Sequence, residues 1–271
     1  MSEALARQMP PVQYADTNGI RMAYYEVGPR TGVPVIFCHG FPELAFSWRH
    51  QLRAFEAAGR WAIAPDQRGY GLTGGPAGAE NYDLEYLTGD LVGLLDRLGI
   101  DKAIFCGHDW GGMVVWDMAL RHPDRVAGVI GVNTPFLPRG PVDPIAAMRA
   151  AYGDDMYVVW FQQPGLADAV LGTDVERSIR FFMRKPLLTL DQYQQRPAEM
   201  RTLALGEALK LYDAATDTQQ FLTDDEIAAF AESFAATGFT GGINWYRNFT
   251  RNWEASAGRQ EHVGVPSLMI M

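Results

Sequence analysis

The stretch from Ala103 to Gly112 constrains the fold of this chain more than any other. An apolar run of strand character ends at Gly107, and a helical pattern begins at Trp110. A strand that turns tightly into a helix pushes the side chain at the apex of the turn out at the carboxyl end of the sheet, where open α/β folds bind ligands. That side chain is Asp109. An ordinary turn in which Asp109 caps the helix would show the same pattern.

An aspartate at this apex limits the chemistry that the turn can support. A carboxylate with a reference pKa of about 3.9 is ionised at pH 7 and needs no base before it attacks. On an acyl carbon it would form an anhydride, which is a poor intermediate. On an sp³ carbon that carries a leaving group it forms an alkyl ester, which water can cleave. Asp109 as a nucleophile therefore indicates epoxides, haloalkanes or haloacids rather than esters or peptides.

Strands alternate with helices through residue 132, and this order predicts an α/β fold with a mostly parallel, doubly wound sheet. We expect a hairpin from the strands 12–15 and 20–27, and further strands at 34–38, 61–65, 103–107 and 126–132. We expect helices at 47–58, with Ser47 as the cap, at 84–98 and at 110–121.

The pattern changes after residue 137. Residues 138–248 show helical spacing and no convincing buried strand, with expected helices at 144–152, 167–183 and 224–235. We therefore expect an α/β core at 1–137, a helical cap at 138–248 inserted after the sixth strand, and a return to the core at 249–271. The final run, 265–271, begins another buried strand in which the sequence stops. Because a half-strand leaves an edge unpaired, we expect about fifty further residues beyond Met271. The alternative is a chain that ends here and could form an ester on Asp109 but not hydrolyse it.

Composition narrows the partners and the compartment. The formal net charge of −9 argues against nucleic acid and against an anionic membrane surface. Residues 1–11 lack the apolar core of a signal peptide, and no apolar run is long enough to span a membrane. Cys38 and Cys106 both lie in apolar strand-like runs and are expected to be buried, reduced thiols. These features together predict a cytoplasmic protein.

Three further sites support a catalytic role for Asp109. The segment His39-Gly40-Phe41-Pro42 follows the strand expected beside the 103–107 strand. There the backbone N–H of Phe41 could converge with that of Trp110 to form an oxyanion hole. The other two sites are Tyr157 and Tyr246 in the expected cap. Either tyrosine alone is as readily explained by packing, because the chain contains eleven.

Taken together, these motifs resemble the epoxide hydrolases of the α/β-hydrolase fold. The likeness runs from about residue 12 to residue 271, and its core motifs are shared with haloalkane and fluoroacetate dehalogenases. The paired cap tyrosines are the part that favours an epoxide hydrolase. The segments that carry the resemblance are His39-Gly40-Phe41-Pro42-Glu43, Ser47-Trp48-Arg49, 66–71, 107–111, Tyr157 before Phe161-Gln162, and Trp245-Tyr246-Arg247.

The resemblance implies a two-step hydrolysis of an epoxide to a vicinal diol, without a cofactor or a metal. Asp109 would form a glycol ester while Tyr157 and Tyr246 donate a proton to the epoxide oxygen, and the Phe41 and Trp110 amides would hold the oxyanion. The implied partners are a small apolar epoxide and water, and the protein would be a monomer or a homodimer. The substrate pocket would be lined by His39, Phe41, Pro42 and Trp110.

The second step requires a general-base histidine and an acid partner. The family places both after strands that would follow Met271. We assign this role to none of the five histidines present, which are His39, His50, His108, His122 and His262. Two other functions therefore stay open: a haloalkane or haloacid dehalogenase that uses the same aspartate, and a non-catalytic receptor for a small molecule on the same fold.

Overall fold

The computed structural model describes residues 8–186, 188, 190–197 and 203–271. Most of the segment 1–11, which the sequence predicts not to be a signal peptide, lies outside the described residues. In the described part of the chain one sheet has the strand order β1-β2-β4-β3-β5-β6-β7. The β1–β2 and β2–β4 pairs are antiparallel and the remaining pairs are parallel, which confirms the expected mostly parallel α/β sheet. The strands are β1 (Gln13–Thr17), β2 (Ile20–Val27), β3 (Val35–Cys38), β4 (Ala62–Pro65), β5 (Ala103–His108), β6 (Val126–Val132) and β7 (Ser267–Ile270).

At the centre of the sheet, the segment after β3, which includes Phe41, lies close to the turn after β5, which includes Asp109. Strands β3 and β5 are parallel neighbours, with Phe37 opposite Cys106 and Cys38 opposite Gly107. The carboxyl ends of the two strands therefore lie side by side, as the sequence predicted. Cys38 and Cys106 are buried and free although their strands are neighbours, and burial raises the pKa of both thiols.

Three longer helices pack on the sheet: α2 (Arg49–Ala57), α3 (Leu84–Leu98) and α4 (Trp110–Arg121). Helix α3 has the predicted bounds, because the Asp83 carboxylate accepts hydrogen bonds from the first turn and Gly99 ends the helix in the left-handed conformation. The predicted cap at Ser47 is wrong. Ser47 lies inside a 3-10 turn, Ala45–Trp48, and α2 begins after it without a side-chain cap.

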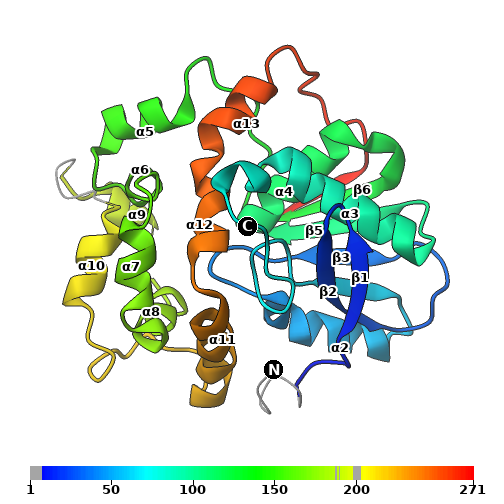
Figure 1. Ribbon diagram of the computed structural model, residues 1–271, viewed down its shortest axis with the longest axis horizontal. Coiled ribbons are helices and arrows are strands. Elements are labelled where there is room, and N and C mark those ends of the chain that lie inside the picture. Colours follow the sequence, from blue (N-terminus) through cyan, green and yellow to red (C-terminus); the bar gives the residue numbers. More distant parts are fainter. Residues whose placement is uncertain (1–7, 187, 189, 198–202) are drawn as a thin grey trace.

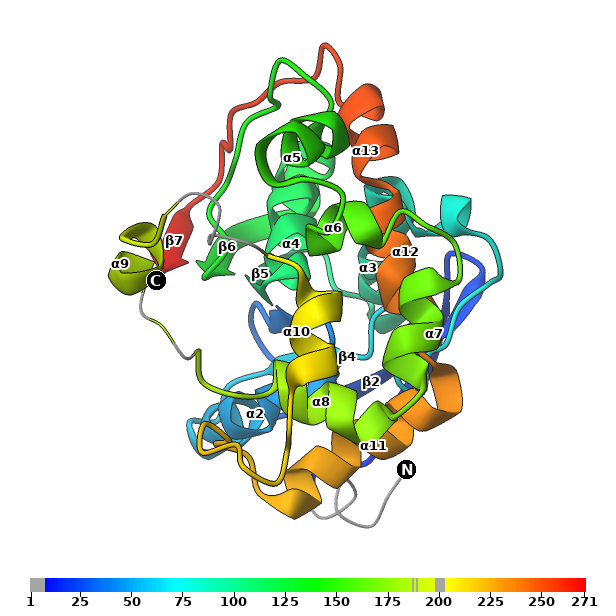
Figure 2. The ribbon, with the colours of Figure 1, turned by 90° about the vertical axis from the view of Figure 1, so that its left-hand side faces the viewer.

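Between β6 and β7, the described residues form helices joined by loops. The helices α6, α7, α8 and α10 lie on one side of α12, and the sheet lies on the other (Figures 1 and 2). None of the described helices has both the length and the apolar character needed to cross a membrane. The helices are α5 (Pro144–Tyr152), α6 (Tyr157–Trp160), α7 (Leu166–Gly172), α8 (Val175–Phe182), α9 (Leu190–Gln194), α10 (Leu205–Leu211), α11 (Asp224–Thr237), α12 (Thr240–Arg247) and α13 (Phe249–Ala255).

The single helix expected at 167–183 is wrong, because the structure has two helices there. Helix α7 ends at Gly172, and the side chain of Asp174 accepts a hydrogen bond from the Arg177 N–H to start α8. Aspartate favours this capping position over a helix interior, because its carboxylate satisfies a free backbone donor at the start of the new helix.

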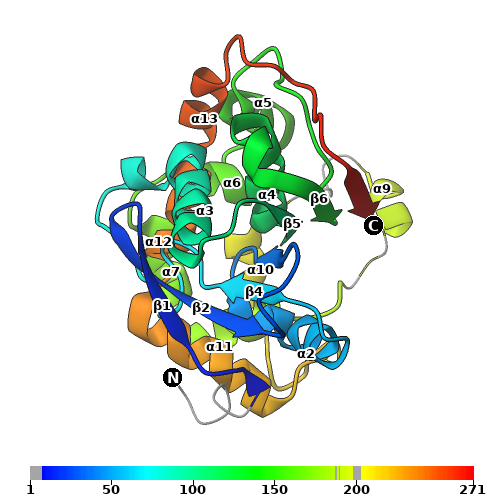
Figure 3. The same ribbon diagram turned by 90° about the vertical axis from the view of Figure 1, so that its right-hand side faces the viewer.

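Strand β7 lies at the edge of the sheet opposite β1 (Figure 3).

Helices α12 and α13 are attached directly to the core. The Trp245 indole donates to the carbonyl of Arg68 at 3.0 Å, and the Asn248 amide donates to the carbonyl of Ala79 at 2.6 Å. Arg68 is itself fixed by a fully buried ion pair with Asp90, at 2.6 Å. Helix α12 is thereby placed relative to the loop after β4 and, through it, relative to the sheet.

The packing of α4 against β3 generates a stability prediction. A Cβ atom on Gly111 would collide with the backbone carbonyl of Cys38, whereas one on Gly172 in α7 would meet no atom within 4 Å. We expect Gly111→Ala to lower the free energy of unfolding by about 1–3 kcal/mol, measured by urea denaturation. The control Gly172→Ala should change it by less than about 0.5 kcal/mol. Equal stability of the two variants would contradict the close α4–β3 contact.

Candidate active site

Asp109 lies at the apex of the turn between β5 and α4, with a backbone φ of 53°. Positive φ is unusual for a residue other than glycine and costs about 1–3 kcal/mol. Small residues on both sides make the turn possible, since a Cβ on Gly107 would collide with the carbonyl of Gly111. The hydroxyl of Thr134, just after β6, donates to the backbone carbonyl of Asp109 at 3.0 Å. The turn is therefore supported from the neighbouring strand as well as from its own helix.

The carboxylate of Asp109 is held by backbone donors. The Phe41 N–H donates to its Oδ1 atom at 2.9 Å, and the Trp110 N–H also donates to the carboxylate. Burial raises the pKa of Asp109 above its usual value, although these two hydrogen bonds act in the opposite direction. The two amides proposed from the sequence thus converge on the Asp109 side chain.

A cavity of about 210 Å³ opens beside Asp109. Of the four residues expected to line the substrate pocket, Phe41 and Pro42 line this cavity, and His39 and Trp110 do not. His39 is fully buried in the turn network: its Nδ1 lies 3.0 Å from the carbonyl of Gly40, and its Nε2 accepts from the Gln67 N–H at 3.1 Å. The remaining lining residues are Glu43, His108, Asp109, Asn133, Thr134, Phe182 and Met183.

Tyr157 and Tyr246, the two tyrosines predicted to lie in a cap, are close together. Their ring centroids are 5.9 Å apart, with an interplanar angle of 75°, and the Tyr246 ring also packs on Phe41 and Trp110. Burial and, second to it, the negative charge of Asp109 raise the pKa of both phenols, that of Tyr157 to about 12. Both phenols are therefore protonated at neutral pH and lie within electrostatic reach of Asp109. Neither lines the cavity beside Asp109.

Glu43 and His108 also line that cavity, and the sequence reasoning did not assign them to the site. The His108 Nδ1 atom lies 3.2 Å from a Glu43 carboxylate oxygen, and the other oxygen accepts from the Gly40 N–H at 2.9 Å. The contact with Glu43 raises the pKa of His108. Their positions at the ends of neighbouring strands, next to Pro42 and Asp109, were the available signal.

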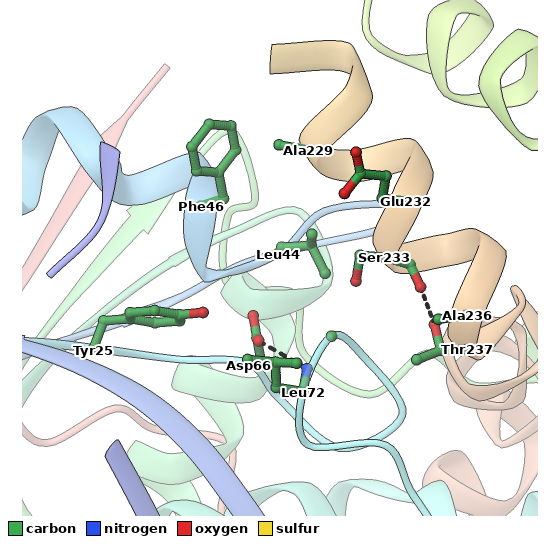
Figure 4. Close-up of a pocket in the computed structure, with 11 residues that line it drawn as sticks. Tyr25, Leu44, Phe46, Asp66, Leu72, Ala229, Glu232, Ser233, Ala236 and Thr237 are labelled. Atoms are coloured by element: carbon green, nitrogen blue, oxygen red, sulfur yellow. Dashed lines mark hydrogen bonds between the residues drawn. The ribbon is translucent and has the colours of Figure 1, made fainter. Parts of the chain in front are cut away.

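Two further cavities lie apart from the Asp109 carboxylate. One, of about 230 Å³, lies between the loop after β4 and helix α11, with Asp66 and Leu72 on one side and Glu232 and Ser233 on the other (Figure 4). The second, of about 630 Å³, is mainly apolar and lies between α4, α5, α13 and the segment that follows β6. Asp109, Tyr157 and Tyr246 line neither of them.

Comparison with known proteins identifies the family to which the chain belongs. The family model for the alpha/beta hydrolase fold matches residues 33–271. Epoxide hydrolase A of Mycobacterium tuberculosis is 44% identical over 265 residues, which cover 96% of this chain and 81% of that protein. Epoxide hydrolase 1 of Siraitia grosvenorii is 43% identical over 248 residues, which cover 89% of this chain and 73% of that protein.

Solved structures agree with these relatives. The crystal structure of epoxide hydrolase A from Mycobacterium thermoresistibile matches with a TM-score of 0.84 and 42% identity, covering 96% of this chain and 81% of that one. Epoxide hydrolase I of potato (Solanum tuberosum) matches with a TM-score of 0.79 and 30% identity, covering 96% and 80%. The chain therefore belongs to the α/β-hydrolase fold family and, within it, to the epoxide hydrolases, as its motifs indicated.

Proposed function

We propose that this protein opens epoxides to vicinal diols through a covalent glycol ester on Asp109. The observation that carries the proposal is the arrangement of the Asp109 carboxylate. Its Oδ1 atom accepts from the Phe41 N–H, the Trp110 N–H donates to the same group, and a cavity lies beside it. The second oxygen, Oδ2, is then the atom that can attack a substrate.

In the first step, Oδ2 attacks a carbon of the epoxide ring while the bond from that carbon to the ring oxygen breaks. The oxygen leaves as a developing alkoxide, and Tyr157 or Tyr246 donates a proton to it. Neutral phenols suit this task, because they remain protonated at pH 7 and are still much more acidic than an alcohol. Oδ1 becomes the carbonyl oxygen of the ester and keeps the hydrogen bond from the Phe41 amide.

In the second step, water attacks the ester carbonyl, and the Phe41 and Trp110 amides stabilise the oxyanion that forms. Collapse of this intermediate releases the diol and restores the Asp109 carboxylate, and the proton given up by the attacking water returns to the tyrosinate left by the first step. In the family that the chain resembles, a histidine deprotonates the attacking water. We assign that role to none of the five histidines of this sequence. His39 is hydrogen-bonded within the turn after β3, and His108 is bound to Glu43.

The phenols favour an epoxide hydrolase over a dehalogenase that uses the same aspartate. A halide leaves as an anion and needs N–H donors, whereas an epoxide oxygen needs a proton. The pKa of each phenol responds to the charge of Asp109, which supports a shared site. Within the proposal, the cap is residues 138–248, the core is 1–137 with a return at 249–271, and the substrate is a small apolar epoxide.

Replacement of the nucleophile tests the ester directly. We expect the wild-type protein to gain the mass of one styrene oxide molecule on a peptide that contains Asp109, measured by mass spectrometry of a rapidly quenched reaction. Asp109→Asn should slow this labelling by more than about a thousandfold, because a carboxamide is a poor nucleophile. The control Asp155→Asn changes an exposed aspartate and should label like the wild type. Undiminished labelling of Asp109→Asn would refute the assignment.

Removal of each phenol tests the proton donors. Tyr157→Phe and Tyr246→Phe should each slow the formation of the ester by about a hundredfold, because the alkoxide loses a donor while the aspartate is unchanged. The rate is measured in a single turnover with excess enzyme. Tyr152→Phe, which alters a tyrosine that is 51% exposed, provides the control and should keep the wild-type rate. Two phenylalanine variants as fast as this control would exclude proton donation by the pair.

The pH dependence of ester formation follows from the pKa shifts. Asp109 attacks only as a carboxylate and its pKa is raised by burial, so the rate should increase with pH through a midpoint above 3.8. The rate should then stay level from about pH 7 to pH 10, because both phenols keep their protons there, with Tyr157 having a pKa of about 12. A decline between pH 8 and pH 10 would show that a more acidic group supplies the proton. Single-turnover rates across this range provide the measurement.

A further inference from the structure

The helices that carry the two phenols cannot position themselves. Helix α6, which begins at Tyr157, has only four residues, and helices of this length are not stable alone. Helix α12, which carries Tyr246, has eight residues and is attached to the core through the Trp245 indole. The position of Tyr157 must therefore come from contacts between α6 and its neighbours.

Gln162, two residues after the end of α6, joins the two helices. Its side-chain Nε2 atom donates one hydrogen bond to the carbonyl of Val158 at 2.8 Å and another to the carbonyl of Tyr246 at 3.0 Å. Both N–H groups of a single amide are thus used, one on each helix. Val158 is next to Tyr157 in the chain, so this bridge links the backbones of the two phenol-bearing segments.

Arg247 makes the reciprocal connection from α12. Its Nε atom donates to the carbonyl of Phe161 at 3.0 Å, and one terminal nitrogen contacts the Asp168 carboxylate of α7 at 2.7 Å. The pair with Asp168 is largely buried, with side-chain exposures of 11% and 15%. A second terminal nitrogen donates to the side chain of Asn244 in α12. The planar guanidinium can hold these groups at once, which a lysine could not.

The ring of Phe161 packs against both phenols. Its centroid lies 5.8 Å from that of Tyr157 and 4.9 Å from that of Tyr246, and the residue is fully buried. Arg247, which follows Tyr246 in sequence, donates to the Phe161 carbonyl and so holds the backbone of the residue whose ring contacts both phenols. Each phenol-bearing segment therefore supplies a donor to the backbone of the other.

We propose that Gln162 and Arg247 are positioning residues that set the separation of the two phenols and place Tyr157 over Asp109 by way of α12. The inference rests on the proposed function, since it assumes that the phenols protonate the epoxide oxygen. Proton transfer depends steeply on the distance between the groups, and a displacement of about 1 Å can cost a hundredfold in rate. Loss of either residue should therefore act on the chemical step rather than on binding of the epoxide.

The test uses Gln162→Met, which keeps the length of the side chain and removes both N–H donors. In single turnovers with styrene oxide, we expect the limiting rate of ester formation to fall at least tenfold, with less than a twofold change in the half-saturating epoxide concentration. Gln51→Met makes the same change at an exposed position in α2 and should match the wild type. Arg247→Lys is the second variant, which keeps the charge beside Asp168 and should also lower the limiting rate.

A double-mutant cycle separates positioning from a general loss of packing. In the Tyr157→Phe background, Gln162→Met should have an effect of less than twofold, because the phenol that it positions is gone. The inference would be overturned by a wild-type limiting rate in both Gln162→Met and Arg247→Lys, or by an undiminished effect of Gln162→Met in that background. If the wild type itself forms no ester on Asp109, the proposed function fails, and this inference fails with it.

Discussion

The hydrogen bond from the Phe41 amide to the Asp109 carboxylate is the contact on which the site depends. It exists because β3 and β5 are parallel neighbours, so that the turns after both strands meet at one edge of the sheet. It also requires the positive φ of Asp109, which costs about 1–3 kcal/mol and is supported by the close approach of Gly111 to β3 and by the Thr134 hydroxyl. The strained turn aims the carboxylate at the Phe41 amide, and in the proposed reaction the other oxygen attacks the epoxide.

The second half of the site is built on helices, and its attachment differs between the two phenols. Tyr246 lies on α12, whose neighbouring Trp245 is hydrogen-bonded to the core. Tyr157 lies on a four-residue helix that contacts α12 through the Gln162 amide. We therefore expect any movement of the helices between β6 and α12 to displace Tyr157 more than Tyr246, since Trp245, next to Tyr246, is hydrogen-bonded to the core.

Local sequence patterns predicted much of the fold, because buried parallel strands leave continuous apolar runs and the strand-turn-helix around Asp109 has a distinctive spacing of glycines. Asp109 and Phe41 could be placed together because each follows a central strand. The start of helix α2 was wrongly predicted, with Ser47 as its N-cap. A 3-10 turn precedes the helix, and the local sequence does not distinguish such a turn from the first turn of an α-helix. The Glu43–His108 contact was missed for another reason: it depends on the directions of two side chains on different strands.

The most direct test of the account is a crystal structure of the protein trapped after reaction with styrene oxide. We predict an ester on Asp109 whose carbonyl oxygen accepts hydrogen bonds from the Phe41 and Trp110 amides, with the new hydroxyl group of the glycol facing the Tyr157 and Tyr246 phenols. An adduct on another side chain, or an ester whose carbonyl oxygen points away from both amides, would contradict the proposed role of the turn.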